Sequence, residues 1–304
     1  MKQRAKGLFA AMVSSATFGM IPLFSIPAQN AGMDTPSVIV YRFLIASIVI
    51  FLVMKYYKCD LSITKSHFWR ISLLALINIV SAITLLEGYK CLSSGAATTI
   101  QFSYPIFTCI IMMVFFGERP TVRTVLAILL AVLGVVFLSG VIDEGAANVS
   151  FKGVALELFS GLTYAIYLIL VPKMKLNDLE SSKLTFWVFA LSFVYMALFA
   201  FTQGGVAAPP TVGVGVSLVM LGLIPTAISN LTLVVGLRAV GSTLTSILGA
   251  LEPLTVMIFS VFWFKEPFTA LIAVGFVCII VSVTLLILPD SNSSESTASD
   301  LQNE

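Results

Sequence analysis

The sequence predicts an all-α membrane protein with ten transmembrane helices, arranged as two inverted five-helix repeats with both termini in the cytoplasm. Three observations lead to this fold class. The 304-residue chain is 58% hydrophobic and 11% charged, whereas soluble domains are roughly 45–50% apolar and about 25% charged. One stretch of the chain occurs twice, and the basic residues are distributed unevenly between alternate loops.

Long apolar runs predict the membrane-spanning elements. A helix needs about 20 mostly apolar residues to cross a bilayer. The runs here are continuous, whereas the strands of a membrane barrel alternate in segments of about ten residues. The expected spans are 7–28, 37–57, 69–89, 95–116, 123–141, 153–172, 183–203, 212–236, 242–264 and 268–288.

The basic residues predict which loops face the cytoplasm. With a cytoplasmic N-terminus, ten spans leave only Lys90, Lys152 and Lys265 outside and Arg42 within a span. The remaining Lys and Arg residues fall inside: Lys2, Arg4, Lys6, Lys55, Lys58, Lys65, Arg70, Arg119, Arg123, Lys173, Lys175, Lys183 and Arg238. Such an excess of cytoplasmic Lys and Arg is typical of membrane proteins.

The duplication predicts the domain organisation. Segments 88–118 and 236–266 align without a gap at an offset of 148, and Gly7, Ser14 and Thr17 reappear as Gly153, Ser160 and Thr163. We expect one repeat in 1–145, a second in 146–289, and a polar, disordered tail in 290–304. Because each half has an odd number of spans, the two repeats must be inverted, as in many secondary transporters.

Several motifs resemble the EamA domain of the drug/metabolite transporter superfamily. They are GLFAAMVSSATFGM and GVALELFSGLTYAIYLILVPK at the start of each half, YRFLIAS in span two, and GYKCLSSGAATTIQFSYPIFTCIIMMVFFGERP with its second copy GSTLTSILGALEPLTVMIFSVFWFKEPF. The resemblance covers roughly residues 7–288. It implies a ten-helix carrier that exports amino acids or other small metabolites. Spans one, three, four, six, eight and nine would surround a central cavity, with spans five and ten peripheral.

Glu252 is the first candidate for substrate binding. Ionisable residues are costly inside a membrane and often functional. Apart from basic residues at the span ends (Lys55, Arg70, Arg123 and Lys183), the spans contain only the charged residues Arg42, Glu87, Glu157 and Glu252. Glu252 lies near the midplane before Pro253, which should leave the carbonyl near Gly249 without its helical donor. Its repeat counterpart is Tyr104, so we expect the two at matching depth. The alternative is that Glu252 only makes a hydrogen bond that holds the bundle together.

Arg42 has two candidate partners, Glu157 and Glu87. All three lie in the outer third of the membrane by residue count, so an ion pair is expected. We favour a fixed structural pair over an extracellular gate, because Arg42 belongs to span two, away from the helices that line the cavity.

Uncharged polar and aromatic residues complete the predicted substrate site. They are Asn78 and Ser81 in span three, Gln101 and Tyr104 in span four, Tyr164 and Tyr167 in span six, and Asn230 in span eight. For any one of them, an ordinary hydrogen bond between helices is the competing interpretation. Pro225 is the best hinge candidate.

These features favour a secondary transporter in the cell membrane. We expect it to export amino acids or related zwitterions or cations by alternating access, with proton coupling through Glu252 as one option and passive facilitation by a channel-like permease as the other. A membrane-embedded enzyme is the less favoured alternative, since no HExxH or GxSxG motif is present and the single histidine, His67, is expected in a cytoplasmic loop. We expect a small-molecule substrate and the lipid bilayer as partners, no nucleic acid, no metal and no cofactor, and leave a homodimer open.

Overall fold

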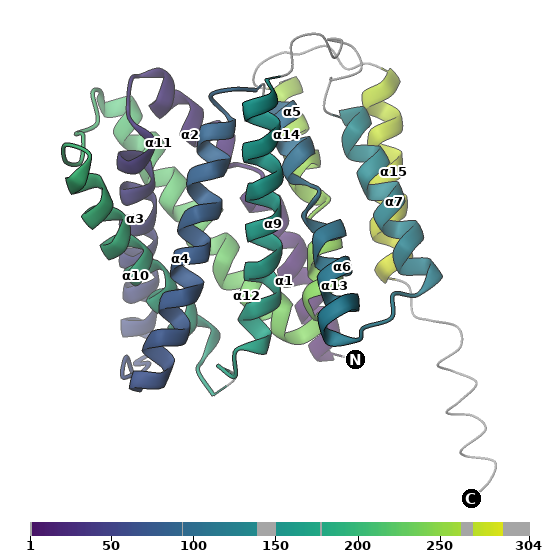
Figure 1. Ribbon diagram of the computed structural model, residues 1–304, viewed down its shortest axis with the longest axis horizontal. Helices are drawn as coiled ribbons and strands as arrows, with labels where there is room; N and C mark the ends of the chain where they lie inside the picture. The colour runs from purple at the N-terminus through teal and green to yellow at the C-terminus, as the bar shows by residue number, and fades with distance from the viewer. Residues whose placement is uncertain (1, 93, 139–149, 177, 263–269, 288–304) are drawn as a thin grey trace, which may run out of the picture.

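A computed structural model describes residues 2–92, 94–138, 150–176, 178–262 and 270–287, and these form a bundle of roughly parallel and antiparallel helices (Figure 1). The elements are α1 (Lys2–Phe18), α2 (Ile21–Asn30), α3 (Thr35–Tyr56), α4 (Lys65–Gly88), α5 (Ser94–Gln101), α6 (Tyr104–Phe116), α7 (Val122–Leu138), α9 (Phe151–Lys173), α10 (Ser181–Thr202), α11 (Val212–Gly222), the π-helix η2 (Leu223–Ile228), α12 (Ser229–Val240), α13 (Ser242–Leu248), α14 (Leu251–Phe262) and α15 (Ala270–Ile287). The predicted tail and the predicted boundary between the halves lie outside the described residues.

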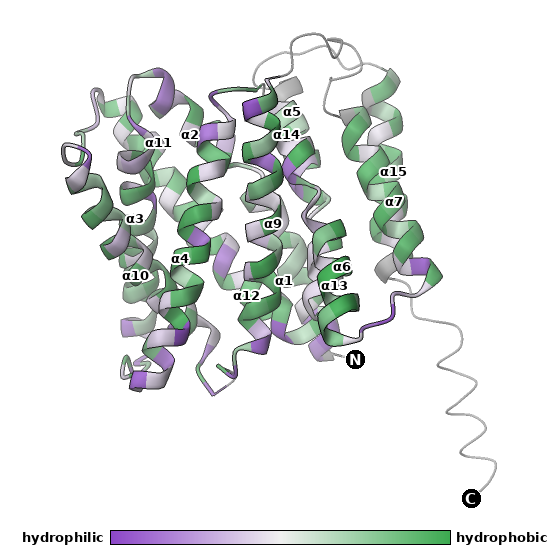
Figure 2. Ribbon diagram, in the orientation of Figure 1, coloured by the Kyte–Doolittle hydropathy of each residue, from purple (hydrophilic) through white to green (hydrophobic). Residues whose placement is uncertain are grey.

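Eight helical segments in the described part of the chain are long and apolar enough to cross a membrane. Apolar residues cover their middle portions and polar residues gather toward their ends (Figure 2). Two further apolar helices, Val122–Phe137 and Ala273–Leu285, are shorter. They coincide with the expected fifth and tenth spans, so a total of ten crossings stays a prediction.

Prolines explain why several spans are interrupted. Proline lacks the N–H that a helix interior needs and clashes with the preceding turn. The first span breaks between α1 and α2 ahead of Pro22, and the fourth breaks between α5 and α6 ahead of Pro105. The ninth breaks between α13 and α14 ahead of Pro253, at the place that matches Pro105 in the repeat. Pro225 lies within η2, so its span changes to a π-helix without ending.

The two halves form the same helix pair twice. Helix α1 packs on α12, and α9 packs on α4. The Ser229 hydroxyl donates to the Ser14 carbonyl at 3.0 Å, and the Ser81 hydroxyl donates to the Ser160 carbonyl at 3.3 Å. Because Ser14 matches Ser160 and Ser81 matches Ser229, these are equivalent contacts. Helix α1 begins at the end of the bundle that holds the N-terminus, whereas α9 begins at the opposite end, so the pairs run in opposite directions (Figure 1).

Glycines allow the paired helices to approach closely. A Cβ at Gly7 would overlap Ala239, and a Cβ at the matching Gly153 would lie 2.9 Å from the Cβ of Cys91, the counterpart of Ala239. In the same way, Gly236 packs on Ala11. Small residues commonly mediate such contacts between membrane helices.

Helices α7 and α15 form a separate pair at one edge of the bundle (Figure 1). The Ser282 hydroxyl donates to the Ala127 carbonyl at 2.7 Å, and Gly134 packs against the Gly275 carbonyl. Large apolar side chains are exposed on both helices: Val125, Leu126, Leu129, Leu133, Val274, Val277, Ile280 and Val281. Such an apolar exposed face fits contact with lipid, as expected for peripheral helices.

Loops at the N-terminal end of the bundle are held together by basic residues. Arg238 donates to the carbonyls of Leu176 and Leu179 at 2.9 and 2.6 Å, and Lys183 forms an ion pair with Asp60 at 3.2 Å. Hydrogen bonds from Ser62, followed by Lys183, lower the pKa of Asp60 to about 2, so this exposed carboxylate stays charged at neutral pH. The cytoplasmic assignment of this end stays a prediction.

The α1·α12 contact should tolerate little added volume at Gly7. We expect Gly7→Ala to lower the thermal stability of the detergent-solubilised protein, because overpacking a well-packed site costs roughly 1–3 kcal/mol. Gly215→Ala is the matched control, since it lies in helix α11 and its added Cβ would be 4.0 Å from its nearest neighbour. Equal stability of the two variants would contradict the tight contact.

Candidate functional site

Tyr104 and Glu252 meet inside the bundle. The Tyr104 hydroxyl donates to Glu252 Oε1 at 3.0 Å, and the residues are only 1% and 4% exposed. They are separated by 148 positions, the offset of the repeat. Two repeat-related residues touch only near the axis that relates the halves, so this hydrogen bond lies close to the pseudo-two-fold axis. Gly249 leaves room for it, because any Cβ there would overlap the Tyr104 hydroxyl.

The carbonyl of Gly249 is not free, contrary to the expectation from sequence. The backbone N–H of Glu252 donates to it at 2.8 Å. Because Pro253 has no N–H to offer, the chain tightens into a turn of the 3₁₀ type, and the residue before the proline supplies the donor. At this break in the helix, the Glu252 side chain can bind a ligand, whereas the Gly249 carbonyl is already hydrogen-bonded.

Aromatic rings extend from Tyr104 toward α1. Tyr164 of α9 meets Tyr104 edge-on with ring centroids 5.0 Å apart, and Phe18 of α1 stacks on Tyr164 at 5.3 Å. The Tyr167 ring also stacks with Tyr164, with ring centroids 6.4 Å apart. We call Phe18, Tyr104, Tyr164 and Tyr167 the aromatic cluster.

Arg42 contacts this cluster at Phe18. Its guanidinium carbon lies 5.9 Å from the Phe18 ring centroid and 5.9 Å from that of Phe43, within the range of cation–π attraction. Its Nε donates to the Thr226 hydroxyl at 2.9 Å. The residue is 4% exposed, and its buried Nη1 has no hydrogen-bond partner. Arg42 therefore has an unused donor next to the aromatic cluster.

The predicted ion pair of Arg42 with Glu157 or Glu87 is wrong, and so is its placement away from the central helices. The reason lies in the π-helix. Pro225 cannot donate to the Leu221 carbonyl, so the Thr226 hydroxyl donates to it at 2.7 Å, and the oxygen of that hydroxyl accepts from Arg42. π-Helical turns often occur at functional sites, and this one holds Arg42 toward α1.

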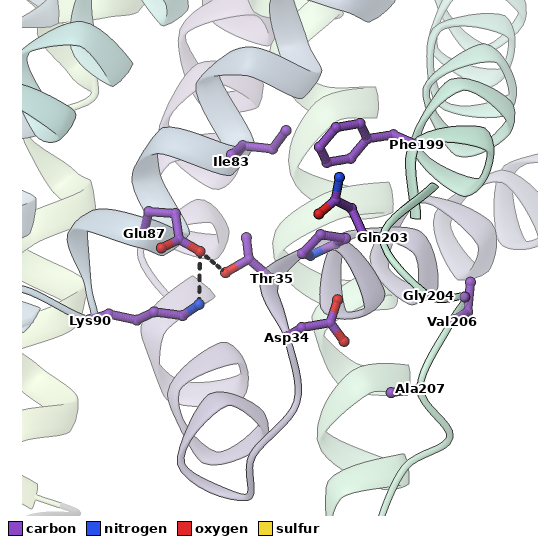
Figure 3. A pocket seen from close by; sticks show the side chains of 12 residues that line it. Asp34, Thr35, Ile83, Glu87, Lys90, Phe199, Gln203, Gly204, Val206 and Ala207 are labelled. Atoms are coloured by element: carbon purple, nitrogen blue, oxygen red, sulfur yellow. Dashed lines mark hydrogen bonds and ion pairs between the residues drawn. The ribbon is translucent and has the colours of Figure 1, made fainter. Parts of the chain in front are cut away.

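Glu87 lies at the rim of a pocket at the far end of the bundle from the N-terminus. Glu87 Oε1 forms an ion pair with Lys90 at 2.8 Å and also accepts the Thr35 hydroxyl (Figure 3). The pocket has a volume of about 660 Å³, and Asp34 and Gln203 also line it. We call it the outer pocket. Glu87 therefore links α4 to α3 and has no contact with Arg42.

Glu157 is completely buried, with 0% of its surface exposed. Neither carboxyl oxygen has a hydrogen-bond partner. The carboxyl group packs against Gly88 at the end of α4, where a Cβ would overlap it. Glu157 is thus neither part of an ion pair nor in contact with the aromatic cluster.

The remaining candidates divide into two groups. Ser81 donates to the Ser160 carbonyl at 3.3 Å, and Asn230 donates to the Thr226 carbonyl at 3.0 Å, so both make structural hydrogen bonds. By contrast, Asn78 Nδ2 and Gln101 Nε2 are buried without a partner. These two amides keep the capacity to bind a ligand.

Phe18 was not among the predicted site residues, and the contact of Thr226 with Arg42 was not predicted. A signal for Phe18 exists in the sequence, because Phe18 and Tyr164 are separated by the 146-residue offset of the first helices and are both aromatic. Thr226 matches Asn78 in the repeat, but nothing in the sequence predicts its contact with Arg42.

Metal-binding geometry is absent from the described ranges, where no group of three or more His, Cys, Asp or Glu side chains could hold an ion. His67, expected in a loop, lies in the first turn of α4, and its Nε2 is 3.1 Å from the Asp178 carboxylate.

Comparison with known proteins identifies the family of this chain. The model of the EamA-like transporter family matches residues 5–140 and 151–288. The chain belongs to the EamA-like transporter family. A protein from Archaeoglobus fulgidus named as an uncharacterized transporter is 23% identical to this EamA-family chain, over 92% of it and 95% of the relative. The uncharacterized transporter YcxC of Bacillus subtilis is 33% identical over 40% of this chain and 38% of its own.

A crystal structure with 14% sequence identity shares the fold. It superposes with a TM-score of 0.76 over 93% of this EamA-family chain and 98% of the other chain. At this identity the likeness concerns the arrangement of helices alone.

The hydrogen bond near the repeat axis should be measurable in a double-mutant cycle. We expect Tyr104→Phe and Glu252→Gln to show a coupling energy of about 0.6 kcal/mol, with about 1.7 kcal/mol as the upper end for bonds between membrane helices. The measurement is unfolding of the purified EamA-family protein in detergent. Tyr167→Phe with Glu252→Gln is the control pair, and a Tyr104 coupling no larger than that of the control would contradict the contact.

Proposed function

We propose that this chain is a secondary transporter that exports amino acids, or related small zwitterions and cations, across the cell membrane by alternating access. The observation that carries the proposal is the central arrangement of charges. Glu252 and Arg42 are both buried and both contact the aromatic cluster, Glu252 through Tyr104 and Arg42 through Phe18.

Each part of this arrangement matches a group on such a substrate. A carboxylate accepts hydrogen bonds from an ammonium group, and aromatic faces attract cations by roughly 0.5–2 kcal/mol. The free Nη1 of Arg42 can donate to a carboxylate, and hydrogen bonds between ionised groups are roughly twice as strong as neutral ones. The arrangement therefore suits a molecule that carries a positive group for Glu252 and a negative group for Arg42.

In this conformation Tyr104 is hydrogen-bonded to Glu252 and Phe18 lies against Arg42. Tyr104 and Tyr167 are fully buried, and Tyr164 and Phe18 nearly so. A substrate must displace at least one ring to reach both Arg42 and Glu252. Movement of the helices that carry the rings, α1, α6 and α9, would open the space.

Pockets at the two ends of the bundle support alternating access. The outer pocket lies at one end, and a pocket of about 410 Å³ lined by Glu118, Lys173, Arg238 and Thr243 lies at the other. Neither is lined by Arg42, Tyr104 or Glu252. The matching helix pairs α1·α12 and α4·α9 supply two equivalent contacts, and opening one while the other stays closed would expose the centre to one side at a time.

Transport by the reconstituted protein tests the proposal. Proteoliposomes loaded with a mixture of the standard amino acids should show saturable counterflow of a labelled amino acid. Glu252→Gln should weaken apparent affinity about 10- to 100-fold, because a hydrogen bond to a charged group contributes roughly 1.5–3 kcal/mol. Glu180→Gln, an exposed position at the start of α10, is the matched control and should transport normally.

Three results would contradict the proposal. Full transport by Glu252→Gln would remove Glu252 from the substrate site. Flux that does not saturate with substrate would favour a passive, channel-like permease. Absence of counterflow for every amino acid in the wild-type protein would exclude this substrate class.

A further inference from the structure

Three residues on one face of α9, Glu157, Ser160 and Tyr164, make contacts that follow one another along the helix. Glu157 packs on Gly88, Ser160 bonds to Ser81, and Tyr164 meets Tyr104 in the aromatic cluster. The first two contacts belong to the α4·α9 interface and the third to the proposed substrate site. Glu157 and Tyr164 are seven residues apart, about 10 Å along a helix. A displacement of α9 therefore acts on both places at once.

Packing does not require an acid at position 157. In the matching interface, α1·α12, the corresponding residue is Ala11, and it packs on Gly236 just as Glu157 packs on Gly88. Ala11 and Glu157 are separated by the same 146-residue offset as Ser14 and Ser160. A methyl group is thus sufficient to close this type of contact. Glu157 adds a titratable group to it.

No described basic side chain neutralises Glu157. Helix α9 packs against α4, α5, α6, α12 and α13. The charged and titratable residues on these helices are Lys65, His67, Arg70, Glu87, Tyr104, Cys109 and Arg238, and Tyr89 follows α4. Helix α9 itself carries Lys152, Tyr164, Tyr167 and Lys173; Lys152 is exposed, and none of the four bonds to Glu157. Glu87 is paired with Lys90, Tyr104 donates to Glu252, and Arg70 and Arg238 donate to loop carbonyls near the other end of α9. Tyr89 lies close enough to interact electrostatically with Glu157 but makes no hydrogen bond with it.

Only a proton suits a carboxyl group in this setting. An unpaired carboxylate anion in a dry interior is penalised by several kcal/mol, and both oxygens of Glu157 are buried without a donor. Metal cations require several oxygen ligands, and the described residues offer no cluster of acidic side chains around Glu157. A protonated carboxyl group is neutral and fits the closed contact with Gly88.

We propose that Glu157 is a proton-binding site, separate from Glu252, that couples proton movement to the opening of the α4·α9 contact. While the contact is closed, the carboxyl group keeps its proton. When the contact opens, the O–H bond breaks, the proton passes to a water molecule, and the carboxylate that remains is hydrated. The proposal rests on the proposed transport function, because the same helix movement exposes the substrate site through Tyr164.

The outer pocket is the expected side of proton release. Gly88, the residue against which Glu157 packs, directly follows Glu87, which lines that pocket (Figure 3). Water entering between α4 and α9 from this end would reach Glu157 before it reached Tyr164, since Glu157 is nearer the start of α9.

Proton movement measured together with substrate movement tests the proposal. Full-length protein is reconstituted in proteoliposomes that contain a trapped pH-sensitive dye, and a gradient of the standard amino acids is applied. The wild-type protein should move protons with the amino acids. Glu157→Gln and Glu157→Ala should keep counterflow within about twofold of wild type and lose amino-acid-driven proton movement, while Glu180→Gln keeps both. The alanine variant reproduces the contact that Ala11 already makes with Gly236, so it should fold.

Infrared spectroscopy of the purified protein separates this proposal from the transport function. A protonated carboxyl group gives a C=O stretching band that a carboxylate lacks, and Glu157→Gln should remove such a band even if no amino acid is transported. An unchanged spectrum would overturn the assignment of the proton. Proton movement that persists in both variants, or wild-type counterflow without proton movement, would overturn the coupling. Absence of counterflow with loss of the band would overturn the transport proposal alone.

Discussion

The hydrogen bond between Tyr104 and Glu252 is the contact on which the centre of this protein depends. It joins two residues that hold the same position in the two repeats. The bond therefore forms only if the fourth span of each repeat, which contains α6 in one half and α14 in the other, reaches the axis. The breaks ahead of Pro105 and Pro253 direct the two side chains inward, and Gly249 leaves space for the phenol. The position of the aromatic cluster follows, since Tyr164 packs directly on Tyr104.

The contacts between helices follow the repeat symmetry of the molecule, whereas the buried acidic residues do not. The serine and glycine contacts of α1·α12 recur in α4·α9, which makes the two interfaces close to interchangeable. The buried acids do not recur: Glu252 is matched by Tyr104 and Glu157 by Ala11. In the proposed alternating access, equal interfaces would allow either side to close, and a single set of charged residues would form one site open to each side in turn.

The sequence predicted the helices and the repeat because hydropathy and internal identity are local properties. It also predicted that Tyr104 and Glu252 would lie at the same depth. The hydrogen bond between Arg42 and Thr226 could not be predicted from hydropathy or from the repeat. It depends on the rotation of α3 and on the π-helix at Pro225, which brings Thr226 within reach of Arg42. For the same reason, the lack of a partner for Glu157 appears only once the helices are packed. The bond from the Glu252 N–H to the Gly249 carbonyl could not be predicted from a regular helix that lacks one bond at Pro253, because it depends on the local tightening of the chain.

We propose that Glu252 and Arg42 recognise opposite charges on one substrate. The most direct measurement is calorimetric binding of a transported amino acid, its amide and its deaminated acid to the purified protein. Wild type should bind the amino acid more tightly than either analogue. Glu252→Gln should abolish the preference over the deaminated acid and Arg42→Gln the preference over the amide, each leaving the other preference intact. Loss of both preferences in each variant, or of neither, would contradict the account.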